Sequence, residues 1–336
     1  MRTFYIFSSG KLERKENTLC LKTSEGKRFI PVTQVEQIYL FGETTLNTKL
    51  INFLSQNGII LHFFNYYGFY TGTFYPREAN ISGTVIVKQV EHYLNPEERL
   101  YLAKEFIISA IHNIRRLLEK KEYKGKTSKK NEHKNNEYEK EILFLKKCEN
   151  EVNQASSVNE VMLIEAKARR AYYSTFEKIT SWEFGERTFR PPENPLNALI
   201  SFGNSMLYTT ILKEIYHTQL NPAVSFLHEP FERRFSLALD ISEIFKPLVV
   251  DRLIFRLINE RQIKPSDFLK EVNFAYLTER GRKTFVYHFD KLLESTIYHR
   301  KLKRKVKYKT LIKLELYKLI KHLLGEKRYK ALRLWW

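Results

Sequence analysis

Apolar and polar positions alternate in short runs along the first part of the chain and follow a helical period along the rest. Residues 1 to about 88 contain aromatic and β-branched runs such as TFYIF, TLCLKT, IILHFFN and TVIVKQV, separated by turn residues at SSG, SEGK, NYYG and ISG. Runs of this kind predict β-strands. After Asn95, a candidate helix cap before PEERLYLAKEF, apolar residues recur every three or four positions, which predicts helices.

One helix is predicted among the strands, in LNTKLINFLSQN, with Thr44 or Thr45 as its cap and Gly58 at its end. We therefore expect an α+β fold in which a β-rich domain over residues 1–90 precedes a larger all-α domain over residues 95–336. Residues 120–141 are almost free of aliphatic side chains, which predicts a mobile basic loop between two helices.

The charge of the chain favours a polyanionic partner. The 336 residues include 57 Lys or Arg and 38 Asp or Glu, which gives a net charge of +19. Residues 1–95 hold ten basic and seven acidic residues, so the helical part carries +16. The positive charge is densest over residues 300–333, where fourteen Lys or Arg accompany two Glu. This predicts nucleic-acid binding; an anionic membrane surface is the rival, although the apolar positions here are typical of a core-facing stripe.

Cysteine usage and the N-terminus indicate an intracellular protein. Cys20 and Cys148 form no CxxC pair and could make at most one bridge, which fits a reducing compartment. The N-terminal residues lack a signal-type apolar stretch, and no uncharged apolar segment is long enough to cross a bilayer. We expect no membrane association.

Candidate metal ligands lie in the stretch NPAVSFLHEPFERRFSLALDISEIFKPLVVDR. Asp240 and Glu243 are one helical turn apart, so both leave the same face of a helix, and His228 can reach that face from the preceding loop. Imidazole together with carboxylate oxygen suits Mn²⁺ and tolerates Mg²⁺, and such ions act on phosphates. The pattern predicts a phosphodiester as the substrate.

A further acidic candidate, Glu165, lies beside the apolar stripe of the predicted helix VNEVMLIEAKARRAYYSTF. Its alternative role is structural, since Glu165 and Arg169 are spaced for an ion pair along one helix. Spacing alone leaves both roles open.

The chain closely resembles the family of the CRISPR-associated adaptation endonuclease/integrase, the first-numbered Cas protein. The resemblance rests on IEAKARRAYYSTF, NPLNALISFGNSMLY and LNPAVSFLHE followed by SLALDISEIFKPLVVDRLIFRLIN, in that order. It implies a metal site made by Glu165, His228 and Glu243 that holds Mg²⁺ or Mn²⁺, with Asp240 either assisting the site or holding the surrounding basic residues. It also implies phosphoryl transfer that inserts spacer DNA into a CRISPR array, in the cytoplasm of a prokaryote.

Partners and DNA contacts are implied by the same resemblance. The β-rich domain is expected to form a homodimer, in complex with the small second-numbered Cas protein, and double-stranded DNA would be bound both as spacer fragment and as array. Five arginines are candidates for phosphate contacts: Arg170 and Arg252, which lie inside family motifs, and Arg169, Arg233 and Arg234.

Two departures from the family pattern affect the expected DNA contacts and the loop shape. Asn204 replaces an aromatic residue after SFG, and the loop PFERR lacks a glycine. Pro247, which has no N–H for the carbonyl of Glu243, predicts a kink or break in the helix after that ligand. Our hypothesis is that this break aims Glu243 towards His228, and a plain helix end is the alternative.

Two other functions stay open at this point. One is a stand-alone metal-dependent nuclease for branched-DNA repair, which would cut DNA without joining it. The other is a non-catalytic DNA-binding scaffold, which would not bind the metal. The presence of all three candidate ligands favours catalysis over the scaffold.

Overall fold

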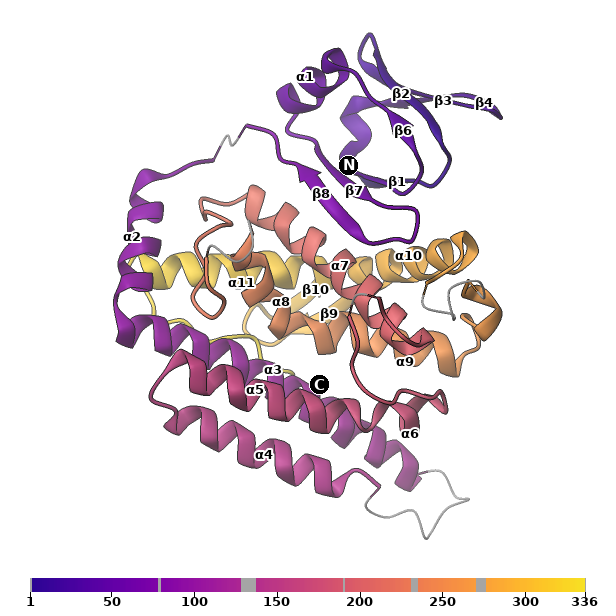
Figure 1. Ribbon diagram of the computed structural model, residues 1–336. Helices are drawn as coiled ribbons and strands as arrows, with labels where there is room; N and C mark the ends of the chain where they lie inside the picture. Colours follow the sequence, from indigo (N-terminus) through magenta and orange to yellow (C-terminus); the bar gives the residue numbers. More distant parts are fainter. Residues whose placement is uncertain are drawn as a thin grey trace.

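The computed structural model describes residues 2–77, 80–127, 137–189, 191–230, 235–269 and 276–335. It has a β-rich part at the N-terminus and a helical part after it (Figure 1). The predicted α+β class is therefore confirmed. None of the helices in these ranges is long and apolar enough to span a membrane.

Two four-stranded sheets form the β-rich part. The first has the order β1-β5-β7-β8, from strands Arg2–Ile6, Val35–Leu40, Ile60–Phe64 and Tyr70–Phe74, with β8 antiparallel to its neighbour. The second has the order β4-β3-β2-β6, from strands Gly26–Pro31, Thr18–Thr23, Gly10–Lys15 and Thr44–Thr45.

Strand β5 faces two cores because successive side chains of a strand point to opposite faces. Ile38 and Leu40 pack in the core of the β-rich part, with Leu12 and Leu19 of the second sheet. On the other face, Tyr39 belongs to the helical core, and its hydroxyl donates to Thr209 Oγ1 at 3.1 Å. The first sheet thus lies between the second sheet and the helices.

Two short predictions for this part were wrong. Helix α1 (Thr48–Gln56) is capped by Asn47, whose Oδ1 accepts from the Leu50 N–H at 2.9 Å, because Thr44 and Thr45 are paired in β6. The run TVIVKQV, expected as a strand, lies in helix α2 (Gly83–Leu94). Its buried Val85 and Gln89 are four residues apart and share one helix face, so tertiary packing overrides β-propensity.

Helices build most of the chain after the β-rich part. They are α3 (Pro96–Thr127), α4 (Glu139–Gln154), α5 (Val158–Tyr173), α7 (Pro195–Tyr216), α8 (Ser236–Phe245), α9 (Arg252–Asn259), α10 (Glu279–Glu294) and α11 (Tyr308–Leu323), with the short α6 (Phe176–Thr180). Asn95 caps α3 as predicted, since its Oδ1 accepts from the N–H groups of Glu97 and Glu98. A hairpin of β9 (Thr296–His299) and β10 (Arg304–Lys307) adds two strands to a part that we expected to be all helix.

The domain limits at residues 90 and 95 remain a prediction, and α2 (Gly83–Leu94) spans the first of them. Of the basic loop predicted at 120–141, residues up to 127 continue α3, α4 begins at Glu139, and residues 128–136 lie outside the described ranges. Both cysteines are buried and free.

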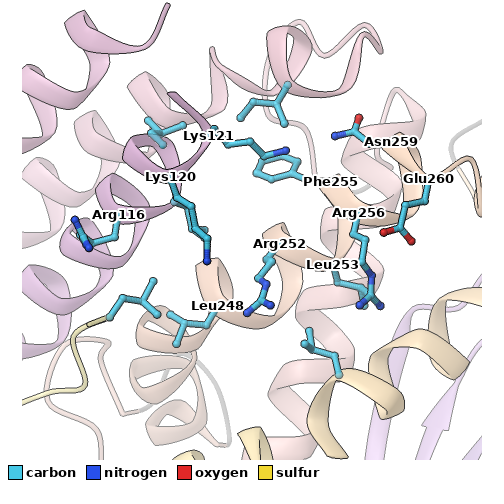
Figure 2. Close-up of a pocket in the computed structure, with 15 residues that line it drawn as sticks. Arg116, Lys120, Lys121, Leu248, Arg252, Leu253, Phe255, Arg256, Asn259 and Glu260 are labelled. Carbon is cyan, nitrogen blue, oxygen red and sulfur yellow. The ribbon is translucent and has the colours of Figure 1, made fainter. Parts of the chain in front are cut away.

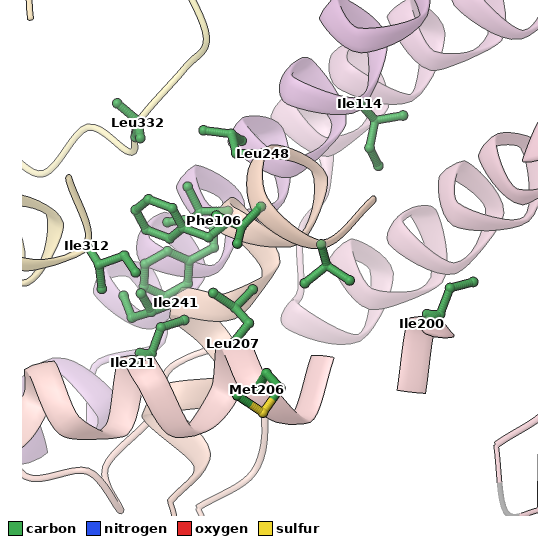
Figure 3. Close-up of a cluster of buried hydrophobic side chains, with 14 of the residues drawn as sticks. Phe106, Ile114, Ile200, Met206, Leu207, Ile211, Ile241, Leu248, Ile312 and Leu332 are labelled. Carbon is green, nitrogen blue, oxygen red and sulfur yellow. The ribbon is translucent and has the colours of Figure 1, made fainter. Parts of the chain in front are cut away.

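The helical core is centred on α7 and α8. Figure 3 shows side chains from α3, α7, α8 and α11 meeting there, among them Phe106, Leu207, Ile241 and Ile312. After α11 the chain runs along α3, where the Leu334 N–H donates to Asn113 Oδ1 at 2.8 Å. Trp335 packs partly on this core, and Trp336 lies outside the described ranges. This packing fixes α5 and α8, which carry the predicted ligands.

Candidate metal centre and nucleic-acid interface

Glu165 lies in the middle of α5, which Ser157 caps by accepting from the Glu160 N–H at 3.2 Å. The buried stripe of α5 packs into the core, and Glu165 lies at its edge with 26% of its side chain exposed. The predicted ion pair along the helix is present, since Arg169 Nε lies 3.1 Å from Glu165 Oε1.

Asp240 of α8 is completely buried and organises the loop that carries His228. Its carboxylate accepts from the backbone N–H groups of Phe226, Leu227 and His228 at 2.7, 3.0 and 3.1 Å. It also lies 2.8 Å from His228 Nδ1. Asp240 therefore orients the imidazole, and Nε2 is the His228 nitrogen that remains for a metal.

Glu243 lies one turn further along α8, is 7% exposed and contacts two cations. Arg169 Nη2 donates to its Oε2 at 2.8 Å, and Lys246 Nζ donates to its Oε1. Burial alone would raise the pKa of Glu243, but Lys246, Arg169 and His228 outweigh burial and lower the pKa to about 2. Glu243 is an anion at neutral pH, as a metal ligand must be.

Arg169, predicted as a DNA contact, is buried among carboxylates. Besides Glu165 and Glu243, its guanidinium faces Asp251, with 3.8 Å between Nη1 and Oδ2. In the part of the chain that the structure describes, neither of those two buried atoms has a hydrogen-bond partner. Burial raises the pKa of Asp251 to about 6, against the effect of Arg169. We call Glu165, Arg169, His228, Asp240 and Glu243 the carboxylate centre.

The donors of the carboxylate centre fit a hard or borderline divalent ion in chemistry. Two carboxylates and an imidazole suit Mn²⁺ or Mg²⁺. Burial raises the pKa of Glu165, and the charge of Glu243 raises it further, as expected for two carboxylates facing one site. Their ligand atoms are not gathered as tightly as a bound ion requires, however. In the described part of the chain, the one trio of such atoms within 4.8 Å of one another is His92, Glu98 and His322.

Pro247 lies in a wider, π-helical turn that follows Glu243. Residues Lys246–Asp251 form a π-helical turn that connects α8 to α9 without a break. Such turns are rare and occur often at functional sites, and the missing N–H of proline accounts for the lost bond to the Glu243 carbonyl. That this turn aims Glu243 towards His228 remains our hypothesis.

The other arginines predicted to contact DNA are either exposed or outside the described residues. Arg170 is exposed on α5, next to the buried Arg169. Arg252 is exposed at the start of α9, and its Nη1 donates to the hydroxyl of Tyr308 at 2.6 Å. Arg233 and Arg234 lie outside the described residues.

A basic pocket of about 370 Å³ opens between α3 and α9 (Figure 2). Its lining includes Arg116, Lys120, Lys121, Arg252 and Arg256, together with Phe255. Among the described residues, the buried Nε and Nη2 of Arg256 have no hydrogen-bond partner. Sequence reasoning missed Arg256; the available signal was its position one turn after Arg252 in RLIFRLIN.

Comparisons with known proteins agree with the motifs. The family described as "CRISPR associated protein Cas1" matches residues 4–291. "CRISPR-associated endonuclease Cas1 2" of Moorella thermoacetica is 56% identical over 336 residues, all of both chains. The Cas1 endonuclease of Thermotoga maritima is 45% identical and covers 97% of this chain and 98% of its own.

Solved structures give the same family. TM1797, a CAS1 protein from Thermotoga maritima, superposes with a TM-score of 0.87 at 43% identity over 99% of this chain and 100% of its own. A structure titled "Casposase bound to integration product" shares the fold, with a TM-score of 0.82 at 21% identity over 98% of this chain and 93% of that one. The resemblance stated from the motifs is confirmed, and the chain belongs to the Cas1 family of CRISPR-associated endonucleases.

Proposed function

We propose that the protein is a metal-dependent DNA endonuclease and integrase that inserts spacer DNA into a CRISPR array by phosphoryl transfer. One observation carries the proposal: Glu165, His228 and Glu243, from three separate segments, contribute to one network of charges. The proposed metal ligands are these three residues, with Mg²⁺ or Mn²⁺ as the ion.

A bound ion would stabilise charge on the phosphate and orient the attacking and leaving oxygens. The residues of the chain prepare the site for it. Burial lowers the pKa of His228, but its contact with Asp240 outweighs burial and raises the pKa overall. A proton on Nε2 competes with the metal for this nitrogen, while Asp240 accepts from Nδ1 and fixes the ring. Asp240 thus assists the site as a positioning residue.

Arg169 supplies positive charge where the two carboxylates would otherwise repel each other. Its bonds to Glu165 and Glu243 keep them paired in the absence of an ion. For Glu165 to bind a metal, it must exchange its bond with Arg169 Nε. We therefore place Arg169 in the carboxylate centre as a positioning residue, and assign phosphate contacts to other residues.

The basic pocket is the proposed contact for a DNA backbone. Arg256 and Arg252 both line this pocket, and Arg252 follows the π-helical turn that leads from the carboxylate centre. Guanidinium groups at this place would hold a strand by its phosphates without reading its sequence. Arg170, exposed on α5, is a further proposed contact, and spacer fragment and array are the proposed double-stranded substrates.

The assembly is proposed from the family. A neighbour at 19% identity that shares the fold is titled "Cas6-RT-Cas1--Cas2 complex". We propose a homodimer through the β-rich part, in complex with the small second-numbered Cas protein, in the cytoplasm of a prokaryote. The edge strand β4, where Phe29 is 49% exposed, offers a surface for such pairing.

A strand-transfer assay tests the function. Purified protein, labelled duplex fragment and supercoiled array plasmid are combined in Mg²⁺ or Mn²⁺, with and without the small partner. We expect Glu165→Ala, His228→Ala and Glu243→Ala to abolish joining while DNA binding persists, and Glu177→Ala, an exposed glutamate of α6, to keep it. Cutting without joining in the unmodified protein would indicate a repair nuclease, and no metal-dependent reaction would indicate a scaffold.

A further inference from the structure

Two histidines and a glutamate meet at a corner of three helices, away from the predicted ligands. His92 lies in the last turn of α2, Glu98 in the first turn of α3 and His322 in the last turn of α11. Helix α2 packs against both α3 and α11, and Figure 1 shows the yellow α11 reaching α2. One ligand atom of each residue lies within 4.8 Å of the others. We call these three residues the histidine corner.

The tautomer of His92 leaves its lone pair on Nε2. His92 Nδ1 lies 2.8 Å from the backbone carbonyl oxygen of Lys88, and because a carbonyl only accepts, Nδ1 carries the hydrogen. Nε2 is then the nitrogen with the lone pair. Histidine ligands of metals commonly donate their other ring N–H to a carbonyl in this way.

His322 contributes an unused nitrogen. The residue is 4% exposed, and its buried Nε2 has no hydrogen-bond partner within the described ranges. This atom lies 3.4 Å from Glu98 Oε2 without hydrogen-bond geometry. A buried polar atom without a partner costs free energy, so its retention calls for an explanation.

The 3.4 Å separation fits a shared metal. Zinc ligands of nitrogen and oxygen lie about 2.1 Å from the ion, so two ligands of a tetrahedral site are about 3.4 Å apart. Two imidazoles with one carboxylate are a known zinc donor set. We propose that His92, Glu98 and His322 form a second metal site, selective for a borderline transition-metal ion such as Zn²⁺ over Mg²⁺.

Arg328 is compatible with this site. Its Nη1 donates to both oxygens of Glu98, at 2.7 and 2.6 Å, and its guanidinium lies over the Tyr101 ring, 3.7 Å from the centroid. A carboxylate has about four acceptor positions, so Glu98 can keep Arg328 and still bind a metal through Oε2.

The corner is connected to the loop of His228. Next to His92, Tyr93 donates to Glu229 Oε2 at 2.9 Å, and next to Glu98, Arg99 lies 2.6 Å from Glu229 Oε1. Arg99 Nε also donates to the Phe226 carbonyl at 3.0 Å. An ion at the corner would therefore fix α11 to the two helix ends that hold this loop, which gives the site a structural role.

The test is a titration of the full-length protein with Co²⁺, an absorbing substitute for Zn²⁺, followed by visible absorption. The His228→Ala variant is the background, because it removes a proposed ligand of the carboxylate centre. In that background we expect one equivalent of Co²⁺, displaced by Zn²⁺ and not by Mg²⁺. Adding His322→Gln or His92→Gln should weaken binding at least about tenfold, whereas adding His288→Gln, on α10, should leave it unchanged.

Three results would overturn the proposal: no Co²⁺ binding in the background variant, equal binding after His92→Gln or His322→Gln, or equal loss after His288→Gln. Circular dichroism shows whether each variant is folded. If His322→Gln does not fold, Co²⁺ binding by His92→Gln decides, because His92 is only half-buried and its replacement disturbs the core less.

Discussion

The carboxylate centre is held together by protein cations, whereas the histidine corner brings two imidazoles and a carboxylate together around an unused nitrogen. In the carboxylate centre, Arg169 and Lys246 bond Glu243, and Arg169 also bonds Glu165. In the histidine corner, Arg328 bonds Glu98, and His322 Nε2 has no hydrogen-bond partner among the described residues.

This difference teaches how a site can be stable without its metal. Paired carboxylates need no ion to keep their geometry, so a catalytic ion can enter and leave while the fold persists. The same pairing makes the ion compete with Arg169. A site with neutral imidazoles lacks that internal compensation, and a metal there adds directly to stability.

The largest expected effect is a loss of stability when Arg169, the cation shared by the carboxylates, is replaced. Arg169→Met leaves Glu243 and Asp251 buried without that partner, which should lower the free energy of unfolding by about 3–5 kcal/mol. Urea denaturation without metal measures it, and Arg170→Met, at the exposed neighbouring position, should change stability by less than about 0.5 kcal/mol. Equal stability of the two variants would show that the carboxylate centre does not depend on Arg169.

The second-largest expected effect is the stabilisation that a metal ion at the histidine corner provides. Zn²⁺ at about 100 times its Kd should stabilise the protein by about 2.7 kcal/mol, since it binds the folded state. The gain should persist in His228→Ala and vanish in His322→Gln, as measured by urea denaturation with and without Zn²⁺. A gain lost in His228→Ala and kept in His322→Gln would assign the stabilising ion to the carboxylate centre instead.

The sequence predicted these two regions unequally because their residues are distributed differently. Asp240 and Glu243 are one turn apart, and Glu165 and Arg169 are also one turn apart, so helical periodicity indicates both pairs. His92, Glu98 and His322 are joined by packing of α11 against α2, and no local pattern predicts a contact across more than 200 residues. The prediction of α2 as a strand also hid the helix end on which His92 lies.

Within the carboxylate centre, the sequence indicated the residue types but not their burial. Arg169 has the spacing of a surface ion pair, and only the approach of α8 and the π-helical turn surrounds it with Glu243 and Asp251. Asp240 shows the same limit. Its position suggested a ligand, whereas the fold uses its carboxylate to hold three backbone N–H groups and the His228 ring.

That role of Asp240 gives the next prediction. Asp240→Asn keeps the size of the side chain but replaces one acceptor oxygen by a donor that faces backbone N–H groups. The imidazole loses its fixed orientation, so the Mn²⁺ concentration for half-maximal DNA cleavage should rise about 10- to 100-fold. Ser242→Ala, on the same helix, is the control. An unchanged requirement for Mn²⁺ would mean that His228 is oriented without Asp240.

The smallest effect concerns which of the two regions faces DNA. Arg256 lines the basic pocket next to the π-helical turn of the carboxylate centre and adds a positive charge there. Arg256→Ala should weaken binding to duplexes of any sequence by a similar factor and reduce the slope of log K against log salt concentration by about 1.

Two matched variants sharpen this last test. Arg28→Ala removes an exposed arginine from β4, and His92→Gln changes the histidine corner; we expect neither to alter the salt slope. A reduced slope in Arg256→Ala alone would place DNA beside the carboxylate centre and leave the corner a structural site. If His92→Gln reduced the slope and Arg256→Ala did not, the nucleic acid would lie against α2 and α11, and the assignment of the two regions would have to be reversed.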